Sequence, residues 1–199
     1  MKIYLIRHGQ TDWNLQGRFQ GREDIPLNET GTLQAKECAK VLAGEKFRAV
    51  VSSPLSRARK TAEIMARQLH IPEVILEEGI TERDFSKVSG MTQKEREAFY
   101  ASGGPDDKEP WELLCSRMMG SLHHYAKKFS PDNIIMISHG ASINAVLSVL
   151  SSGMTGTGKI LLKNTCINIL QYEQESFKLE EYNLTAEEYH ALRVNLEQK

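Results

Sequence analysis

Two histidines, His8 and His139, stand in similar sequence surroundings, since each follows a short apolar run and precedes a glycine. The runs are Ile3 to Ile6 and Ile134 to Ile137, and both are typical of buried β-strands. A neutral imidazole can act as a nucleophile or as a general acid or base near pH 7. Because ligands of parallel α/β proteins bind beyond the carboxyl ends of the strands, both imidazoles are expected at such a site. They should meet there if the two strands are neighbours.

Two arginines add positive charge at the same expected sheet edge. Arg7 directly precedes His8, and Arg57 falls in the first turn of the helix predicted after the strand Ala49–Val51. Guanidinium groups bind tetrahedral phosphate oxygens through paired hydrogen bonds. The sequence therefore predicts a phosphate group as the occupant of this pocket.

The combination of these residues is more informative than any one of them. A single histidine after a strand is more often an ordinary core or surface group, and an arginine beside Arg59 and Lys60 is more often a solvated helix side chain. The tripeptide Arg-His-Gly, however, occurs by chance in roughly one chain in a hundred of this length. Gly9 and Gly140 would let the backbone approach a ligand closely, and a helix after His139 would direct N–H groups at an anion.

The elements that must position these residues alternate between strand and helix. Predicted strands are Ile3–Ile6, Ala49–Val51, Val74–Leu76, Ile134–Ile137, Ile160–Leu162, Ile167–Tyr172 and Phe177–Tyr182. Predicted helices cover about 31–42, 92–100, 110–129, 141–150 and 186–196, with one more opening at 52–54 and running to about 69. Loops are expected over 7–28 and 81–91. This alternation favours an α/β fold, a three-layer sandwich with a mostly parallel central sheet flanked by helices, formed by residues 1–199 as a single domain.

Several segments of the chain resemble the histidine phosphatase superfamily, in its phosphoglycerate mutase-like branch. The matching segments are Leu5-Ile6-Arg7-His8-Gly9-Gln10-Thr11-Asp12-Trp13-Asn14, Phe19-Gln20-Gly21, Pro26-Leu27, Ser52-Ser53-Pro54-Leu55-Ser56-Arg57-Ala58, Thr61-Ala62, Glu82 and Ser138-His139-Gly140. They occur in the family's order and cover the chain from residue 1 to about 170. The first motif is highly specific, and the later ones are weaker individually.

The resemblance implies a role for each matching residue. His8 matches the nucleophile that becomes phosphohistidine, and Glu82 matches the proton donor, although Asp84 lies close by. The catalytic group implied is His8, Glu82, His139, Arg7 and Arg57. The phosphate- or substrate-binding positions implied are Arg7, Asn14, Gln20, Gly21, Arg57, His139 and Gly140. No metal or other cofactor is expected, because the arginines take the place of a cation. The adjacent His123 and His124 would point in different directions on a helix.

The resemblance leaves more than one function open. Family mutases carry a long insertion with paired arginines after the acid, whereas residues 83–138 contain no Arg-Arg pair. This favours a phosphatase of small phosphorylated metabolites, with a cofactor-dependent phosphoglycerate mutase as the alternative. A catalytically weak phosphate-binding interaction module is a third hypothesis, disfavoured because the catalytic group is complete. The chain also reads Ser86-Lys87-Val88-Ser89-Gly90 where the family commonly has Gly-x-Trp-Glu-Gly, which leaves the substrate undetermined.

The composition of the chain argues against two classes of binding partner. The net charge is −1, and both nucleic acid and an anionic membrane would favour a basic surface, so neither is expected as the main partner. The partner expected is a small-molecule phosphate ester, and the oligomeric state is not readable. Three scattered cysteines, Cys38, Cys115 and Cys166, fit a reducing compartment, and the start of the chain lacks a signal-peptide pattern. A cytoplasmic protein is the expectation.

Overall fold

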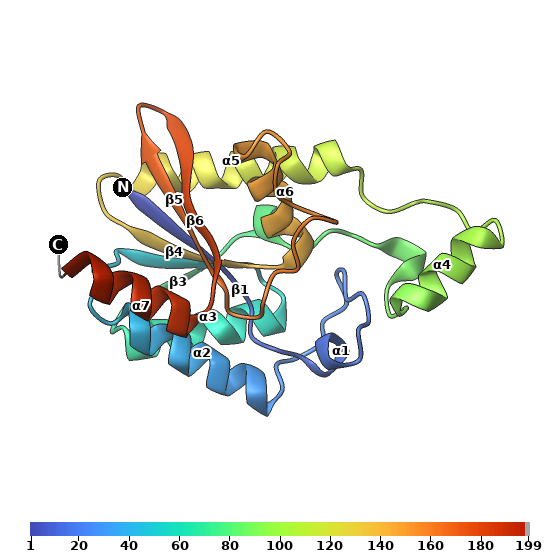
Figure 1. Cartoon of the computed structure of the whole chain (residues 1–199), viewed down its shortest axis with the longest axis horizontal. Coiled ribbons are helices and arrows are strands. Elements are labelled where there is room, and N and C mark those ends of the chain that lie inside the picture. Colours follow the sequence, from blue (N-terminus) through green and yellow to red (C-terminus); the bar gives the residue numbers. More distant parts are fainter. Residues whose placement is uncertain (198–199) are drawn as a thin grey trace.

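A six-stranded sheet forms the centre of the molecule, with the strand order β3-β2-β4-β1-β5-β6 (Figure 1). The structure, a computed structural model, describes residues 1–197. The strands are β1 (Lys2–Arg7), β2 (Ala49–Ser52), β3 (Val74–Leu76), β4 (Ile134–Ser138), β5 (Ile167–Glu173) and β6 (Ser176–Leu184). The first four are parallel to their neighbours among themselves, whereas β5 is antiparallel to both β1 and β6. The prediction of a mostly parallel sheet is confirmed.

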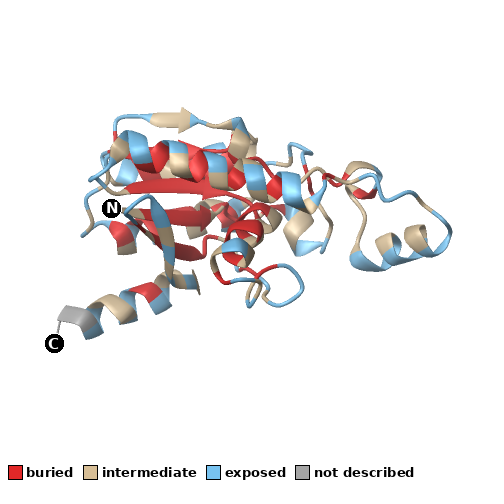
Figure 2. Ribbon diagram, turned by 90° about the horizontal axis from the view of Figure 1, so that it is seen from above, coloured by how far each residue is buried: buried red, intermediate tan, exposed pale blue. Residues whose placement is uncertain are grey.

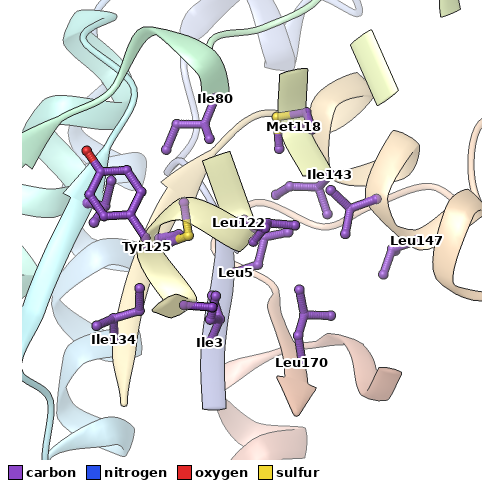
Figure 3. Packing of buried hydrophobic residues seen from close by; sticks show 14 of the residues in the cluster. Ile3, Leu5, Ile80, Met118, Leu122, Tyr125, Ile134, Ile143, Leu147 and Leu170 are labelled. Carbon is purple, nitrogen blue, oxygen red and sulfur yellow. The ribbon is translucent and has the colours of Figure 1, made fainter. Parts of the chain in front are cut away.

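Helices cover both faces of this sheet (Figure 1). One face packs against α2 (Glu29–Leu42), α3 (Ser56–Gln68) and α7 (Ala186–Glu197), and the other against α5 (Trp111–Phe129) and α6 (Gly140–Leu150). The cause is visible in β1, where successive side chains point to opposite faces. Ile3 and Leu5 join the cluster under α5 and α6 (Figure 3), while Tyr4 and Ile6 join the cluster on the other face. The predicted three-layer α/β sandwich is confirmed.

The segment between β3 and α5, residues 77–110, lies largely outside the three-layer sandwich. It contains the 3₁₀ turns η1 (Glu78–Ile80) and η2 (Ser86–Val88) and the helix α4 (Gln93–Ala101). Thr92 and Glu95 form a reciprocal capping box that begins α4, but the helix has no buried residue within the described part of the chain. Figures 1 and 2 show α4 projecting well away from the sheet. A short helix, α1 (Asp12–Leu15), interrupts the loop predicted over 7–28.

The predicted strand Ile160–Leu162 is wrong. Within residues 1–197 this stretch pairs with no strand, because its carbonyls are used by side chains: that of Leu161 accepts from Asn183 Nδ2 and that of Leu162 from Arg7 Nη1. Two glycines with positive φ, Gly156 and Gly158, precede it, and the N–H groups of Lys159 and Ile160 both turn back to the carbonyl of Gly156. The apolar run therefore has an irregular backbone and is not a strand at the edge of the sheet.

The longest helix is α5, with 19 residues. Neither it nor any other helix in the described range 1–197 combines the length and hydropathy required to cross a bilayer.

Candidate active site

The register of the sheet brings the two histidines together. β1 and β4 are parallel neighbours in which Arg7 pairs with Ser138, so His8 and His139 leave the sheet at the same level. Their ring centroids are 5.1 Å apart, and both residues are almost completely buried. The backbone N–H of His8 also donates to the carbonyl of Ser138, at 3.0 Å. The expectation that the two imidazoles meet beyond the strand ends is confirmed.

His8 is held as a neutral imidazole with one free lone pair. Its Nδ1 lies 2.7 Å from the carbonyl oxygen of Gly9, which can only accept, so Nδ1 carries the proton and Nε2 the lone pair. Burial lowers the pKa of His8 well below 6.5, and the charges of Arg57 and Arg7 lower it further. Thr61 Oγ1 accepts from the N–H of Gly9 at 3.0 Å and anchors this turn. The ring is thus prepared to act as a nucleophile through Nε2.

His139 uses the opposite nitrogen for its internal contact. Its Nε2 lies 2.8 Å from Ser53 Oγ, and that oxygen already accepts from the N–H of Leu55 at 3.3 Å. The Ser53 hydroxyl can donate its proton to Nε2, and in that arrangement the proton of the neutral ring is on Nδ1. Nδ1 is buried and has no partner among the residues described. Burial and then the charge of Arg57 lower the pKa of His139 well below 6.5.

Two buried guanidinium groups complete the inner pocket. Arg7 Nη1 donates to the carbonyl of Leu162 at 2.6 Å. Arg57 Nη1 and Nη2 donate to the carbonyls of Glu23 and Gly21, at 2.7 and 2.8 Å. Burial lowers the pKa of both arginines, that of Arg57 to about 10. Guanidinium groups nevertheless keep their charge in proteins near neutral pH.

Three buried nitrogen atoms in this pocket lack an acceptor: Arg7 Nε, Arg57 Nε and His139 Nδ1 have no hydrogen-bond partner within residues 1–197. Buried polar groups without partners are costly and rare, so such a cluster signals a ligand. A tetrahedral oxyanion offers several acceptor oxygens in a small volume and matches three converging donors. The inner pocket is therefore suited to a phosphate group.

Glu82 places its carboxylate at the start of α6, beside this pocket. Its Oε2 accepts from the N–H of Ala141 at 3.2 Å, and its Oε1 accepts from the N–H of Ser142 at 3.1 Å. The Ser142 hydroxyl lies 3.1 Å from the same Oε1 but makes its shorter contact, at 2.7 Å, with the carbonyl of Thr81. A Cβ on Gly140 would lie 3.6 Å from Arg7 Nε and 3.8 Å from Glu82 Oε2, so these groups surround the same small space. The helix after His139 does direct N–H groups at an anion, but at least two of them serve Glu82. Asp84 is absent from the cavity lining, and its carboxylate accepts from the N–H of Ser86.

The remaining predicted residues divide into two groups. Asn14, Gln20 and Gly140 line the same cavity as Arg7, His8, Arg57 and Glu82. Gly21 does not line it and instead supplies the carbonyl that holds Arg57. The expectation that Gly9 allows close approach to a ligand is wrong: a Cβ there would lie 2.4 Å from the backbone oxygen of Gly31, so this glycine permits contact between two chain segments.

Sequence reasoning missed several residues that hold the site in place. Asn164 Nδ2 donates to the carbonyl of His8 at 3.1 Å and to Asn14 Oδ1 at 3.2 Å. Ser53 supports His139, and Arg117 lies behind Glu82. Ser53 and Thr61 stand inside matched motifs and could have been found from them. Asn164 and Arg117 lie in stretches without a pattern, so no signal in the sequence marks them.

An open cavity of about 890 Å³ extends outward from the inner pocket. Of the described residues that line it, eight are cationic and one is a carboxylate, although the whole chain has a net charge of −1. The cations are Arg7, Arg18, Arg57, Arg83, Arg96, Lys108, Lys159 and Lys163, and the carboxylate is Glu82. The cavity is therefore suited to anionic ligands, although Arg18, Lys108 and Lys163 also pair with carboxylates that do not line it. No cluster of three or more metal-binding side chains occurs in the described chain, and the ring of His123 packs against Tyr172 and Phe177.

These features define an α/β protein with a histidine- and arginine-lined oxyanion site at the carboxyl ends of its parallel strands. The chain belongs to the histidine phosphatase superfamily (branch 1), whose family model matches residues 3–185.

Named relatives agree with this assignment. The chain is 35% identical to the Bacillus subtilis protein named uncharacterized phosphatase PhoE, over 92% of this chain and 95% of that one. It is 32% identical to the metal-independent phosphoserine phosphatase of Arabidopsis thaliana, over 92% and 81% of the two chains. Among solved structures, phosphoserine phosphatase from Entamoeba histolytica in complex with 3-phosphoglyceric acid matches with a TM-score of 0.81 and 33% identity, over 92% of this chain and 97% of that one.

Proposed function

We propose that this chain is a metal-independent phosphatase that hydrolyses small phosphomonoesters through a phosphohistidine at His8. The observation that supports it most directly is the pairing of a neutral imidazole, its Nε2 lone pair free, with buried donors that lack an acceptor. A nucleophile beside converging hydrogen-bond donors for an oxyanion is the arrangement that phosphoryl transfer requires.

In the first step, His8 Nε2 attacks phosphorus in line with the leaving oxygen. A phosphorus–nitrogen bond forms as the phosphorus–oxygen ester bond breaks. Glu82 enters protonated and gives that proton to the leaving oxygen, which departs as an alcohol. Arg7, Arg57 and the Nδ1–H of His139 neutralise the charge on the equatorial oxygens, and this stabilisation supplies most of the acceleration.

In the second step, water replaces the alcohol. Glu82, now a carboxylate, takes a proton from the water as its oxygen attacks the phosphohistidine. The phosphorus–nitrogen bond breaks, its electron pair returns to Nε2, and inorganic phosphate leaves. His8 is again neutral and Glu82 again protonated, so the cycle closes without a metal or another co-reactant.

Phosphatase activity is favoured over mutase activity by the segment between Glu82 and His139. A mutase must keep its phosphoenzyme away from water until the phosphoryl group returns to the substrate. The segment here supplies α4, which buries none of its described residues, and no paired arginines. The names of the relatives and the cationic cavity favour small phosphorylated acids as the substrate class. The mutase remains the second candidate.

We further propose that residues 1–199 act as one domain in the cytoplasm. Two hydrophobic clusters share a single sheet, and the family model spans 3–185, which supports one folding unit. The cysteines in the described range are free, as expected in a reducing compartment.

Rapid quench with ³²P-labelled substrate tests the mechanism. The wild type should give a phosphoenzyme that is labile in acid and stable in base, with EDTA present throughout. His8→Ala should abolish the label and reduce turnover by at least about 10⁴-fold. Full turnover in that variant, or loss of wild-type activity in EDTA, would contradict the proposal.

A further inference from the structure

Arg117, on α5, uses every N–H group of its side chain behind the active site. Nε and Nη2 donate to the two carboxylate oxygens of Glu109, at 2.7 and 2.9 Å. Nη1 donates to the carbonyls of Gly79 and Thr81, at 3.0 and 2.7 Å, and Nη2 also donates to the carbonyl of Glu82, at 3.1 Å. A guanidinium group has five N–H donors in a fixed plane, and all five are engaged here. One side chain thus fixes three carbonyls of the segment that presents Glu82.

Glu109 completes the support on the other side of Glu82. Its Oε2 accepts from the N–H of Asp84 at 3.2 Å, and its own N–H donates to the carbonyl of Asp84 at 2.9 Å. Its carbonyl accepts from Arg83 Nε at 2.8 Å. Burial by itself would raise the pKa of Glu109, but the hydrogen bonds and charge of Arg117 lower it below its ordinary value. The carboxylate therefore stays ionised and paired.

The ion pair between Arg117 and Glu109 is largely buried, where such a pair adds little to the stability of the fold. The Glu109 side chain is 5% exposed and that of Arg117 is 17% exposed. A buried ion pair loses much of its attraction to desolvation, and packed apolar residues often serve stability equally well. What apolar residues cannot do is fix the carbonyl groups around a carboxylate that must meet a leaving group.

Glu82 is consequently fixed from two helices. α5 holds its backbone through Arg117, and α6 holds its carboxylate through Ala141 and Ser142. We propose that Arg117, oriented by Glu109, is a positioning residue for proton transfer by Glu82 to the leaving group. This inference rests on the proposed function and adds a requirement to it: the acid works only while the Arg117 contacts set its approach to the leaving oxygen.

A pair of aryl substrates tests the proposal. Phenyl phosphate has a poor leaving group that needs a proton, and p-nitrophenyl phosphate has a good leaving group that does not. Arg117→Lys keeps the charge but cannot reach five acceptors. We expect kcat/KM for phenyl phosphate to fall by about 100-fold, and that for p-nitrophenyl phosphate by less than about threefold. Glu109→Gln keeps the shape of the partner of Arg117. It should lower kcat/KM for phenyl phosphate by about tenfold, again with little loss on p-nitrophenyl phosphate.

A double-mutant cycle separates positioning from general destabilisation. If Arg117 acts through Glu82, then Arg117→Lys added to Glu82→Gln should slow phenyl phosphate hydrolysis by no more than about twofold. Tyr125→Phe is the matched control, since it removes another hydrogen bond of α5, to Glu77, and leaves every hydrogen bond of Arg117 in place. It should lower stability and leave the leaving-group selectivity unchanged.

These measurements distinguish the positioning role of Arg117 from the acid role of Glu82. Equal losses on both substrates in Arg117→Lys, or additive losses in the double variant, would overturn the inference while leaving Glu82 as the acid. If Glu82→Gln itself shows no leaving-group selectivity, the acid role in the proposed function fails. Should Arg117→Lys not fold, Glu109→Gln is measured against the same substrates and decides the matter by the same criterion.

Discussion

The two His-Gly strand ends share a sequence pattern but differ in structure. At the end of β1, Nδ1 of His8 donates to the carbonyl of Gly9, and the chain continues into a long loop. At the end of β4, Nε2 of His139 contacts Ser53, and Gly140 begins α6 directly. The first imidazole therefore has Nε2 free, and the second has Nδ1 free.

The difference shows how neighbouring groups can suit one residue type to two different chemical tasks. A carbonyl can only accept a hydrogen bond, so it forces a proton onto the nitrogen it touches and leaves a lone pair on the other. A hydroxyl can donate, so it can satisfy the bare nitrogen of His139 and leave a proton on Nδ1. His8 is thereby suited to attack, and His139 to donate to an anion. Neighbouring groups, and not the His-Gly pattern itself, assign the roles.

Replacement of His139 is the strongest test of the difference between the two histidines. In His139→Ala one donor to the equatorial oxygens is lost, and removal of such a donor typically costs about 10²–10³ in kcat. We expect a fall of this size in kcat/KM, measured with p-nitrophenyl phosphate, with labelled phosphoenzyme still formed in a single turnover. The phosphoenzyme should be absent only in the His8 variant. If both variants lose it, the two histidines do not have separate tasks.

The two glycines should respond in opposite ways to alanine. A Cβ on Gly9 would lie 2.4 Å from the backbone oxygen of Gly31, which cannot move without shifting α2, so Gly9→Ala should cost about 3 kcal/mol of unfolding free energy. On Gly140 the nearest atoms are at 3.6 Å or more, which is ordinary contact. Gly140→Ala should fold normally and, because its methyl group occupies space beside Arg7, weaken inhibition by inorganic phosphate by about tenfold.

Urea unfolding and phosphate inhibition, measured on both alanine variants, check this pair. A Gly9 variant with wild-type stability, or a Gly140 variant with unchanged phosphate affinity, would show that the two strand ends are not used differently. Wild-type protein under the same conditions serves as the reference for each measurement.

Much of the fold could be predicted because local pattern and tertiary structure agree. The apolar runs of β1 and β4 are buried on both faces, so their composition alone marks them as central strands. Arg7, His8 and His139 follow from these strand ends, and Arg57 from the start of α3. Ile160–Leu162 has the composition of a strand, but distant side chains, Arg7 and Asn183, use its carbonyls, and composition does not reveal such contacts.

The supporting residues could not be predicted for a related reason. Arg117 lies on α5 and acts on carbonyls 35 to 38 residues away in the chain. Asn164 reaches His8 over 156 residues. Backbone carbonyls are present at every position, so nothing in the amino-acid pattern distinguishes those that accept a distant side chain. Only the packing of α5 and the 157–164 segment against the site reveals these contacts.

The smallest expected effect is a pH dependence of stability that both histidines share. Burial lowers the pKa of His8 and of His139 well below 6.5, whereas in the unfolded chain each titrates near 6.5. Below pH 6.5 the unfolded chain binds more protons than the native one, so stability is full above that pH and decreases as the pH falls. The slope is at most about 1.4 kcal/mol per pH unit for each ring.

Urea unfolding at pH 7.5, 6.5 and 5.5 should show this loss of stability, and His8→Asn and His139→Gln should each reduce the slope. Saturating phosphate should reduce it as well, since a bound anion favours the protonated ring. A wild-type curve that is flat between pH 7.5 and 5.5 would mean that the native rings titrate as they do in the unfolded chain. His8 would then lose its Nε2 lone pair to a proton as the pH falls through about 6.5.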